Sequence, residues 1–344
     1  MVSLLKVYLQ WGAPMTRAIV ARAVVIGAGS WGAAIATALN HAGQQTMVLA
    51  RRQESVDALA MGRCLQLPDS PPAAPIAATL DPACLDGAEL IFVAVPVVAN
   101  QASFMMIAER QKNRPLAVVS LCAKGIGKAD DGSAMLLTDL ASRLLPDHPL
   151  AVFSGPSFAD EVFAGLPAAL VAASDDLATA NRIQDAFEGS NLRLYSNDDP
   201  VGVALAGAMK NVIAIAAGCA VGAGFGDNAK AAILTRGLAE IARFASLMGA
   251  KPDTIFGLAG VGDLALTCAG PHSRNMAFGM ALGRGEAPPA KLAEGSRTVA
   301  QLAALAKAKG VDLPITNAVD NLVNHGQNLH AVVASLLARR AGAE

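Results

Sequence analysis

The chain has 344 residues, of which 53% are hydrophobic but only 4% aromatic. Its 27 basic and 28 acidic residues give a formal net charge of -1, which argues against nucleic acid or a membrane surface as a partner. The length favours two domains over a single core. The five cysteines and five histidines show no metal-ligand or redox spacing, so we expect no metal site and a reducing, cytoplasmic compartment.

Residues 1–20 contain short apolar runs but neither a sustained hydrophobic region nor a small-residue cleavage site. We interpret them as an N-terminal extension, with Met15 as an alternative start and a signal peptide as the other alternative. The longest apolar stretch, residues 211–226, is glycine-rich and too short to span a bilayer. We therefore expect a soluble protein without stable membrane insertion.

Seven short apolar runs alternate with alanine-rich helical segments in the first half of the chain. They cover residues 23–29, 46–50, 90–95, 116–122, 150–156, 168–174 and 192–196. Continuous apolar runs are typical of strands covered on both faces, and their alternation with helices predicts a doubly wound, mainly parallel sheet. We thus predict an α/β Rossmann-like domain over residues 21–197, with a proline-rich surface loop at 68–75.

The strand signal disappears after about residue 198. A helix is predicted to begin there, with acidic residues and a proline in its first turn, and the helical pattern continues to residue 344. Breaks are expected at residues 224–227, 247–253, 257–263 and 309–316. The second half therefore predicts an all-helical substrate or catalytic domain over residues 198–344.

The first predicted strand runs into a G-x-G-x-x-G motif that opens an alanine-rich helix. Gly27 permits a tight turn, Gly29 lets the backbone approach a pyrophosphate, and Gly32 lets the helix pack closely on the strand. The phosphates are expected at the helix N-terminus, where free amides and the helix dipole favour an anion. This context predicts a dinucleotide site.

The second predicted strand ends in Arg51 and Arg52. An NAD-specific site usually has an acidic residue at this point to bind the ribose hydroxyls. Two guanidinium groups instead suit a 2′-phosphate, which points to NADP. The alternative is a pair of solvated arginines at a strand end.

The stretch LAGAMKNVIAIAAG (205–218) places a lysine in an otherwise apolar helix. Helical periodicity puts Gly207, Lys210, Asn211, Ala214 and Gly218 on one face. A lysine that reaches solvent needs a long apolar track for its stem, which glycine and alanine do not supply. We therefore interpret Lys210 as a functional cation.

Further polar residues follow at turns or strand ends. Asp263 and Thr267 lie four residues apart on one predicted helix face. The turn Ser273-Arg274-Asn275 suits a phosphate or carboxylate clamp, although a surface turn with a capping serine is the alternative. The segments 123–125 and 155–158 lie at the ends of predicted strands, where open α/β sheets bind ligands.

Taken in order, these stretches resemble the bacterial biosynthetic NAD(P)-dependent glycerol-3-phosphate dehydrogenases. The resemblance runs from about residue 23 to the 330s and rests on GAGSWG (27–32), AKG (123–125), SGPSFADEV (154–162), MKNVIAIAAG (209–218), GFGDNAKAAILTRGLAE (224–240), GLAGVGDLALTC (257–268), SRNMAFG (273–279) and EG with a following arginine (294–297). Departures occur at Cys122-Ala123, where the family often has Ala-Thr, and at residues 296–299.

The resemblance, together with the motifs above, implies the following site. Lys210 is the catalytic residue. The residues expected to bind the cofactor, NAD(H) or NADP(H), are Gly27, Gly29, Ser30, Trp31, Gly32, Arg51, Arg52, Lys124, Ala159, Arg274, Leu292 and Glu294. The residues expected to bind the substrate are Lys124, Gly155, Ser157, Lys210, Asn211, Asp263, Thr267, Ser273, Arg274 and Asn275.

The family further implies reversible hydride transfer between nicotinamide and C2 of dihydroxyacetone phosphate, which yields sn-glycerol 3-phosphate for glycerophospholipid biosynthesis. Lys210 is then expected to donate the proton, with burial and Lys124 lowering its pKa and Asp263 opposing that shift. A homodimer is expected from the family alone. The alternatives are a related two-domain dehydrogenase of β-hydroxyacids or keto acids, and a non-catalytic NAD(P)-binding sensor.

Overall fold

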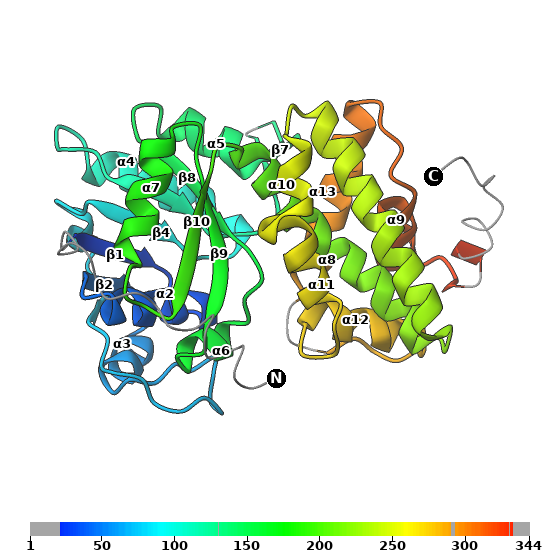
Figure 1. Cartoon of the computed structure of the whole chain (residues 1–344), viewed down its shortest axis with the longest axis horizontal. Coiled ribbons are helices and arrows are strands. Elements are labelled where there is room, and N and C mark those ends of the chain that lie inside the picture. The colour runs from blue at the N-terminus through cyan, green and yellow to red at the C-terminus, as the bar shows by residue number, and fades with distance from the viewer. Residues whose placement is uncertain (1–20, 130, 290–292, 330, 333–344) are drawn as a thin grey trace, which may run out of the picture.

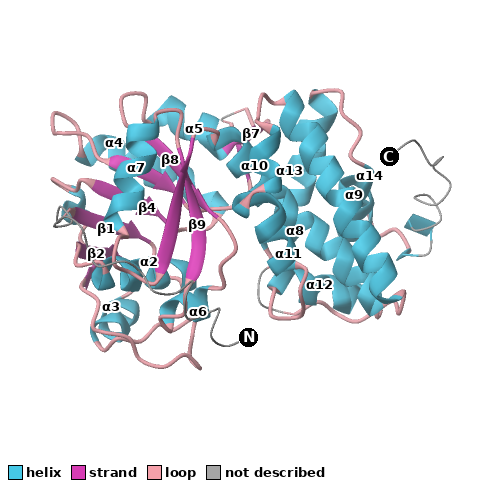
Figure 2. Ribbon diagram, viewed as in Figure 1, coloured by secondary structure: helices cyan, strands magenta, loops and turns pink. Residues whose placement is uncertain are grey.

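A computed structural model describes residues 21–129, 131–289, 293–329 and 331–332 of the chain. The predicted N-terminal extension, residues 1–20, and Leu292 lie outside the described residues. A sheet domain and a helical domain lie side by side, as Figures 1 and 2 show, with the described strands all before residue 198. The predicted two-part fold class is confirmed.

The sheet domain is built on eight strands in the order β10-β9-β8-β5-β4-β1-β2-β3. Their bounds are β1 Arg22–Ile26, β2 Gln45–Leu49, β3 Ala78–Thr79, β4 Leu90–Val93, β5 Val118–Leu121, β8 Leu150–Ser154, β9 Ala168–Ala173 and β10 Leu192–Asn197. All seven predicted strands are present, and β3 is an addition. The order reverses between β1 and β4, so the loops after these two strands flank the crevice where open α/β sheets bind ligands.

One strand pair departs from the parallel arrangement. Neighbouring strands are parallel except β8 and β9, which pair antiparallel, so β9 and β10 run opposite to the other six. Parallel neighbours need a crossover of a dozen or more residues, usually with a full helix. The connection from β8 to β9, residues 155–167, is long enough for a crossover, but its one helix, α6 Ala159–Phe163, has only 5 residues and is too short to run back along the strand. The chain therefore turns back at the same end of the sheet.

Helices cover both faces of the sheet. Val25 packs in one apolar cluster with Ile35 of α2, whereas its neighbour Val24 packs in another with Phe104 of α4. Successive strand residues therefore enter opposite cores, which explains the continuous apolar runs. The helical turns of this domain are α2 Ser30–His41, α3 Gln53–Ala60, η1 Pro82–Leu85, η2 Val97–Ala99, α4 Asn100–Arg110, α5 Leu137–Leu144, α6 Ala159–Phe163 and α7 Leu177–Ala186.

A small hairpin of the sheet domain was not predicted. Strands β6 Ile126–Lys128 and β7 Ala134–Leu136 pair antiparallel. Ile126 and Leu136 are buried in the core cluster of the helical domain. The hairpin therefore joins the two domains just beyond Lys124.

The helical domain is organised around α8, Pro200–Gly222, which is buried along most of its length. Around it lie α9 Gly226–Leu247, α10 Pro252–Phe256, η3 Leu258–Gly262, α11 Asp263–Thr267, α12 Arg274–Gly283, α13 Glu294–Ala308 and α14 Pro314–Asn324. Among the described residues, α8 is the one helix that is long and apolar enough to cross a membrane. Its most apolar 18-residue stretch, however, is 89% buried inside the protein. It is a core helix.

The turn before α11 and the packing of α8 against α12 were not predicted from the sequence. The predicted break at 257–263 is instead a π-helical turn, η3, that leads directly into α11. Glycines bring α8 and α12 into backbone contact, because a Cβ at Gly218 or Gly279 would collide with the main chain of the other helix. The N-terminus of α12 is thereby held beside α8. The five cysteines are free, and all but Cys84 are buried.

Candidate active site

A cleft of about 420 Å³ lies between the two domains. The sheet domain contributes the start of α2, the loop around residues 66–70, Lys124 and residues 157–160, and the helical domain contributes α8, α11, α12 and Glu294. The predicted surface loop at 68–75 thus reaches the cleft with its first residues. Gln66, just before this loop, and Asp69, within it, line the cleft but were not predicted, because a polar loop carries no local motif.

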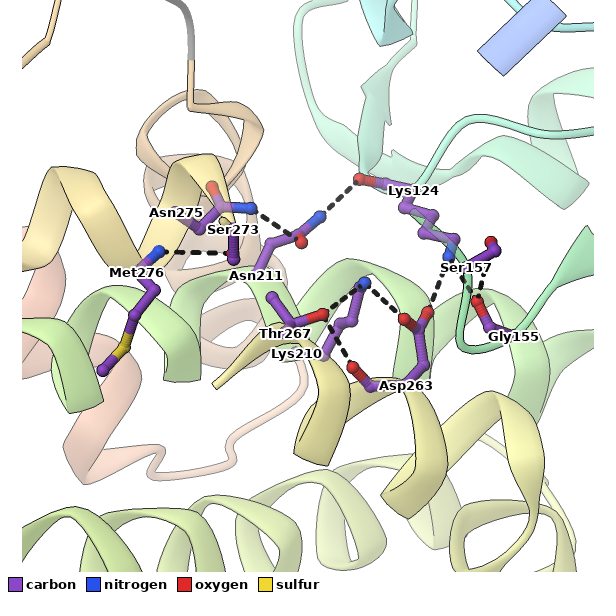
Figure 3. Close-up of polar contacts among 10 residues, drawn as sticks. All are labelled: Lys124, Gly155, Ser157, Lys210, Asn211, Asp263, Thr267, Ser273, Asn275 and Met276. Atoms are coloured by element: carbon purple, nitrogen blue, oxygen red, sulfur yellow. Dashed lines mark hydrogen bonds and ion pairs between the residues drawn. The ribbon is translucent and has the colours of Figure 1, made fainter. Parts of the chain in front are cut away.

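Lys210 is buried, with 7% of its surface exposed. Its Nζ donates to Asp263 Oδ1 at 2.6 Å and to Thr267 Oγ1 at 2.7 Å, as Figure 3 shows. Thr267 Oγ1 in turn donates to the main-chain oxygen of Asp263 at 2.6 Å. The predicted face of α11 therefore meets the predicted face of α8, and Lys210 does not reach bulk solvent.

The same carboxylate holds a second lysine. Lys124 Nζ donates to Asp263 Oδ2 at 2.6 Å and to the main-chain oxygen of Gly155 at 3.1 Å. Asp263 is 1% exposed, so two ammonium groups share one buried negative charge. Ser157 lies next to this pair and donates its hydroxyl to the Gly155 oxygen at 3.3 Å.

This arrangement sets the proton affinity of Lys210. Burial lowers the pKa of Lys210 to about 8, because the charged form loses its hydration. Asp263 opposes the shift, and the nearby positive charge of Lys124 adds to it. These are the directions expected from the sequence, and they bring Lys210 into the range where a proton can be exchanged near neutral pH.

A chain of amide groups crosses the site. Asn211 Nδ2 donates to the main-chain oxygen of Lys124 at 3.5 Å, and Asn275 Nδ2 donates to Asn211 Oδ1 at 2.9 Å (Figure 3). Asn275 Oδ1 accepts from the N–H of Gly295 at 2.9 Å. The predicted ligand Asn275 therefore also links α8 to the start of α13, where the predicted cofactor residue Glu294 lies. Gly295 was not predicted, because a main-chain donor leaves no side-chain signal.

The turn before α12 has features of both the predicted anion clamp and the alternative, a surface turn with a capping serine. Ser273 caps the helix by accepting from the N–H of Met276 at 3.3 Å. Arg274 lines the cleft and is exposed, and its guanidinium forms no hydrogen bond or ion pair with the described part of the chain. An unpaired guanidinium at a cleft wall is free to bind an anion.

The glycine-rich loop has the shape that a dinucleotide requires. Gly27 adopts a positive φ of 113°, and a Cβ there would lie 2.6 Å from the oxygen of Ala94 after β4. Gly29, the N-cap of α2, has open space where a Cβ would be, and no side chain caps the helix. The first amides of α2 are therefore available to a phosphate group, so these residues fit NAD(H) or NADP(H).

The remaining predicted cofactor residues are placed as follows. Ser30 and Trp31 open α2, Ala159 opens α6, and Glu294 opens α13, all four at the cleft. Arg51 and Arg52 are exposed after β2, and no partner for them is found within the described ranges. No group of three metal-ligating side chains occurs among the residues that were placed.

Comparison with known proteins gives one consistent result. Models for the N- and C-terminal parts of NAD-dependent glycerol-3-phosphate dehydrogenase match residues 22–180 and 199–334. Proteins named glycerol-3-phosphate dehydrogenase [NAD(P)+] from Mesorhizobium japonicum and Nocardia farcinica are each 41% identical, over 322 and 334 residues. The alignments cover 92% and 93% of this chain, and 92% and 98% of those proteins.

Solved structures agree with the sequence comparison. The glycerol-3-phosphate dehydrogenase of Coxiella burnetii superposes with a TM-score of 0.84 at 34% identity, covering 92% of this chain and 98% of that one. A ketopantoate reductase from Ralstonia eutropha reaches a TM-score of 0.56 at 16% identity, covering 92% and 99%, which is a likeness of fold alone.

Proposed function

The chain belongs to the NAD-dependent glycerol-3-phosphate dehydrogenase family, and we propose that its interdomain cleft reduces dihydroxyacetone phosphate reversibly to sn-glycerol 3-phosphate with Lys210 as the proton donor. The observation that carries the assignment of Lys210 is its burial against Asp263 and Thr267. This product serves glycerophospholipid biosynthesis. A cytoplasmic location and a homodimer stay predictions.

The protein's part in the reaction is to supply a proton where negative charge develops on the substrate. The chemistry that NAD(P)H supplies when bound is a hydride to the carbonyl carbon of the substrate. As negative charge grows on the carbonyl oxygen, the Nζ proton of Lys210 passes to that oxygen. In the reverse direction neutral Lys210 removes the proton from the hydroxyl group. Thr267 and Asp263 hold Nζ in place through both steps.

The substrate phosphate belongs at the other end of the cleft. Arg274 offers an unpaired guanidinium there, and Ser273 stands beside it at the start of α12. Binding a group that does not react supplies energy to orient the carbonyl against Lys210 and the cofactor. Lys124, held by Asp263 and the Gly155 oxygen, lies beside Lys210 on the side away from Ser273 (Figure 3).

The glycine-rich loop and the uncapped start of α2 are assigned to the cofactor pyrophosphate, and Arg51 and Arg52 to the adenosine side. Arg51 and Arg52 would bind the 2′-phosphate of NADP by donating hydrogen bonds to it. Glu294 is assigned to a late contact from the helical domain.

The substrate assay separates this function from its alternatives. The purified full chain is mixed with NADPH or NADH, and the loss of reduced nicotinamide absorbance is followed. We expect turnover with dihydroxyacetone phosphate and none with a panel of keto acids such as pyruvate and ketopantoate. Turnover with a keto acid alone would identify a keto-acid dehydrogenase, and cofactor binding without any turnover would identify a sensor.

A further inference from the structure

Three side chains outside the proton-transfer site join the two domains across the cleft. Phe158, at the N-cap of α6, and Asp160, in its first turn, come from the sheet domain, whereas His272 comes from the turn before α12. The rings of Phe158 and His272 stack with centroids 4.0 Å apart and planes 5° from parallel. His272 Nε2 lies 3.0 Å from Asp160 Oδ2. We call these three residues the clasp.

The clasp is adjacent in sequence to proposed ligands on both sides. Phe158 lies between Ser157 and Ala159, and His272 directly precedes Ser273 and Arg274. All three clasp residues line the cleft. Figure 1 shows α6 and α12 at the same lower edge of the two domains. A shift at the clasp therefore moves the proposed phosphate end of the site relative to the proposed cofactor end.

The start of α12 is attached to both domains. Asn275 ties it to α8 within the helical domain, through the hydrogen bond to Asn211. His272 ties it to the sheet domain, where the glycine-rich loop lies. Arg274, between these two attachments, has no partner of its own among the placed residues. His272, in the turn before α12, thus contacts the sheet domain directly, beside the indirect link through Asn275, Asn211 and the Lys124 oxygen.

We infer that Phe158, Asp160 and His272 position Arg274 against the sheet domain, so that a phosphate bound by Arg274 places its carbonyl at Lys210 and the cofactor. This inference rests on the proposed function of Arg274. The clasp touches no reacting atom and acts through Arg274. His272 and Asp160 have side chains 48% and 40% exposed, so the ring stack, more than the ion pair, holds the contact.

A comparison of two substrates tests this role. Dihydroxyacetone presents the same carbonyl as dihydroxyacetone phosphate but has no phosphate for Arg274. We expect His272→Ala to lower kcat/KM for dihydroxyacetone phosphate by about 3- to 10-fold, the scale of one lost aromatic stack. The value for dihydroxyacetone should stay within about 2-fold of the parent, because the lost contact acts only through the phosphate. A general loss of structure would lower both values alike.

A matched set of variants completes the test. His325→Ala removes a histidine that pairs with Asp320 within the helical domain, and we expect it to change neither substrate. His272→Phe keeps a ring on Phe158 and should restore kcat/KM to within about 2-fold of the parent. Arg274→Ala with His272→Ala should lose no more than Arg274→Ala alone, since interacting residues are not additive.

Three results would overturn the clasp: an unchanged kcat/KM in His272→Ala, an equal loss on both substrates, or losses that add fully with Arg274→Ala. A His272→Phe variant as impaired as His272→Ala would contradict the role of the stack. If Arg274→Ala itself leaves kcat/KM for dihydroxyacetone phosphate unchanged, the assignment of Arg274 in the proposed function fails. If only His272→Ala leaves it unchanged, the clasp alone fails.

Discussion

Lys210 Nζ lies 2.6 Å from Asp263 Oδ1, while the other oxygen of the same carboxylate holds Lys124 at the same distance. Two buried charges, Lys210 and Asp263, and the half-buried Lys124 together carry a net charge of +1. Such a charge is costly away from water, and the lowered pKa of Lys210 reflects that cost. The feature that would suit Lys210 to the proposed role of proton donor is thus a cost to folding.

Asp263→Asn should weaken the reduction by leaving less of Lys210 protonated at neutral pH. Asp263 raises the pKa of Lys210 against the effect of burial, so its loss lowers that pKa further and leaves two ammonium groups facing each other. We expect kcat for dihydroxyacetone phosphate reduction to fall at least about 10-fold at neutral pH. The alkaline limb of the reduction profile should also move to lower pH.

Asp199→Asn is the control for this variant. Asp199 is a buried aspartate that caps α8 by accepting from the N–H of Gly202 at 2.8 Å, and it does not line the cleft. We expect it to lower the melting temperature without moving the pH profile. A profile that stays in place in Asp263→Asn would contradict the coupling of Asp263 to Lys210.

The two directions of the reaction should respond to pH with opposite signs. Reduction needs protonated Lys210, so kcat/KM for dihydroxyacetone phosphate should fall as pH rises through about 8. Oxidation of sn-glycerol 3-phosphate needs neutral Lys210 and should rise over the same interval. Initial rates from pH about 7 to 10 check both limbs. A reduction limb near the ordinary lysine pKa of about 10.4 would contradict the assignment.

Arg51 and Arg52 decide the choice of cofactor if they bind a 2′-phosphate. Replacing both with serine should raise the KM for NADPH by at least about 10-fold, the scale of one or two lost charge-assisted hydrogen bonds. The KM for NADH should change less than about 2-fold. Arg63→Ser, at another exposed arginine, is the control. An equal change in the KM for NADPH and for NADH would contradict binding of the 2′-phosphate and support the alternative, a pair of solvated arginines.

Glu240 stabilises the helical domain away from the cleft. It is 4% exposed and caps α14, accepting from the N–H groups of Ile315 at 2.5 Å and Thr316 at 3.3 Å. Burial raises its pKa, which these hydrogen bonds oppose. Glu240→Ala removes the acceptor of these two N–H groups and of the Thr316 hydroxyl. It should destabilise the fold by about 2 kcal/mol, lowering the melting temperature by about 5 °C.

Thermal unfolding followed by circular dichroism measures this effect. Glu286→Ala, which removes an exposed glutamate paired with Arg284, should change the melting temperature by less than about 1 °C. At low temperature both variants should keep the parent's kcat. A melting temperature that stays unchanged in Glu240→Ala would contradict the capping role.

Much of the sheet could be predicted because its strands carry continuous apolar runs that point into two cores at once. The reversal of β9 and β10 could not, since it depends on the short helix α6 in the connection rather than on the strands. The hairpin β6–β7 escaped prediction for a different reason. Its strands have three residues each, too few to establish a period, and their burial comes from the helical domain.

The site divides in the same way. Lys210 could be singled out because a lysine on a helix face of small residues has no local explanation, and the structure shows it to be buried. Its partnership with Asp263 spans 53 positions, and that of Lys124 with Asp263 spans 139, so only the fold brings them together. His272 had no sequence signal, because a single histidine in a turn reads as an ordinary surface residue.

The central claim is that Lys210 moves the proton, and Lys210→Met tests it most directly. Methionine fills a similar volume without a charge and leaves Asp263 paired with Lys124. We predict that kcat for dihydroxyacetone phosphate reduction falls at least about 100-fold, while the Kd for NADPH, from fluorescence titration, stays within about 2-fold of the parent. A kcat within a few-fold of the parent would contradict the account.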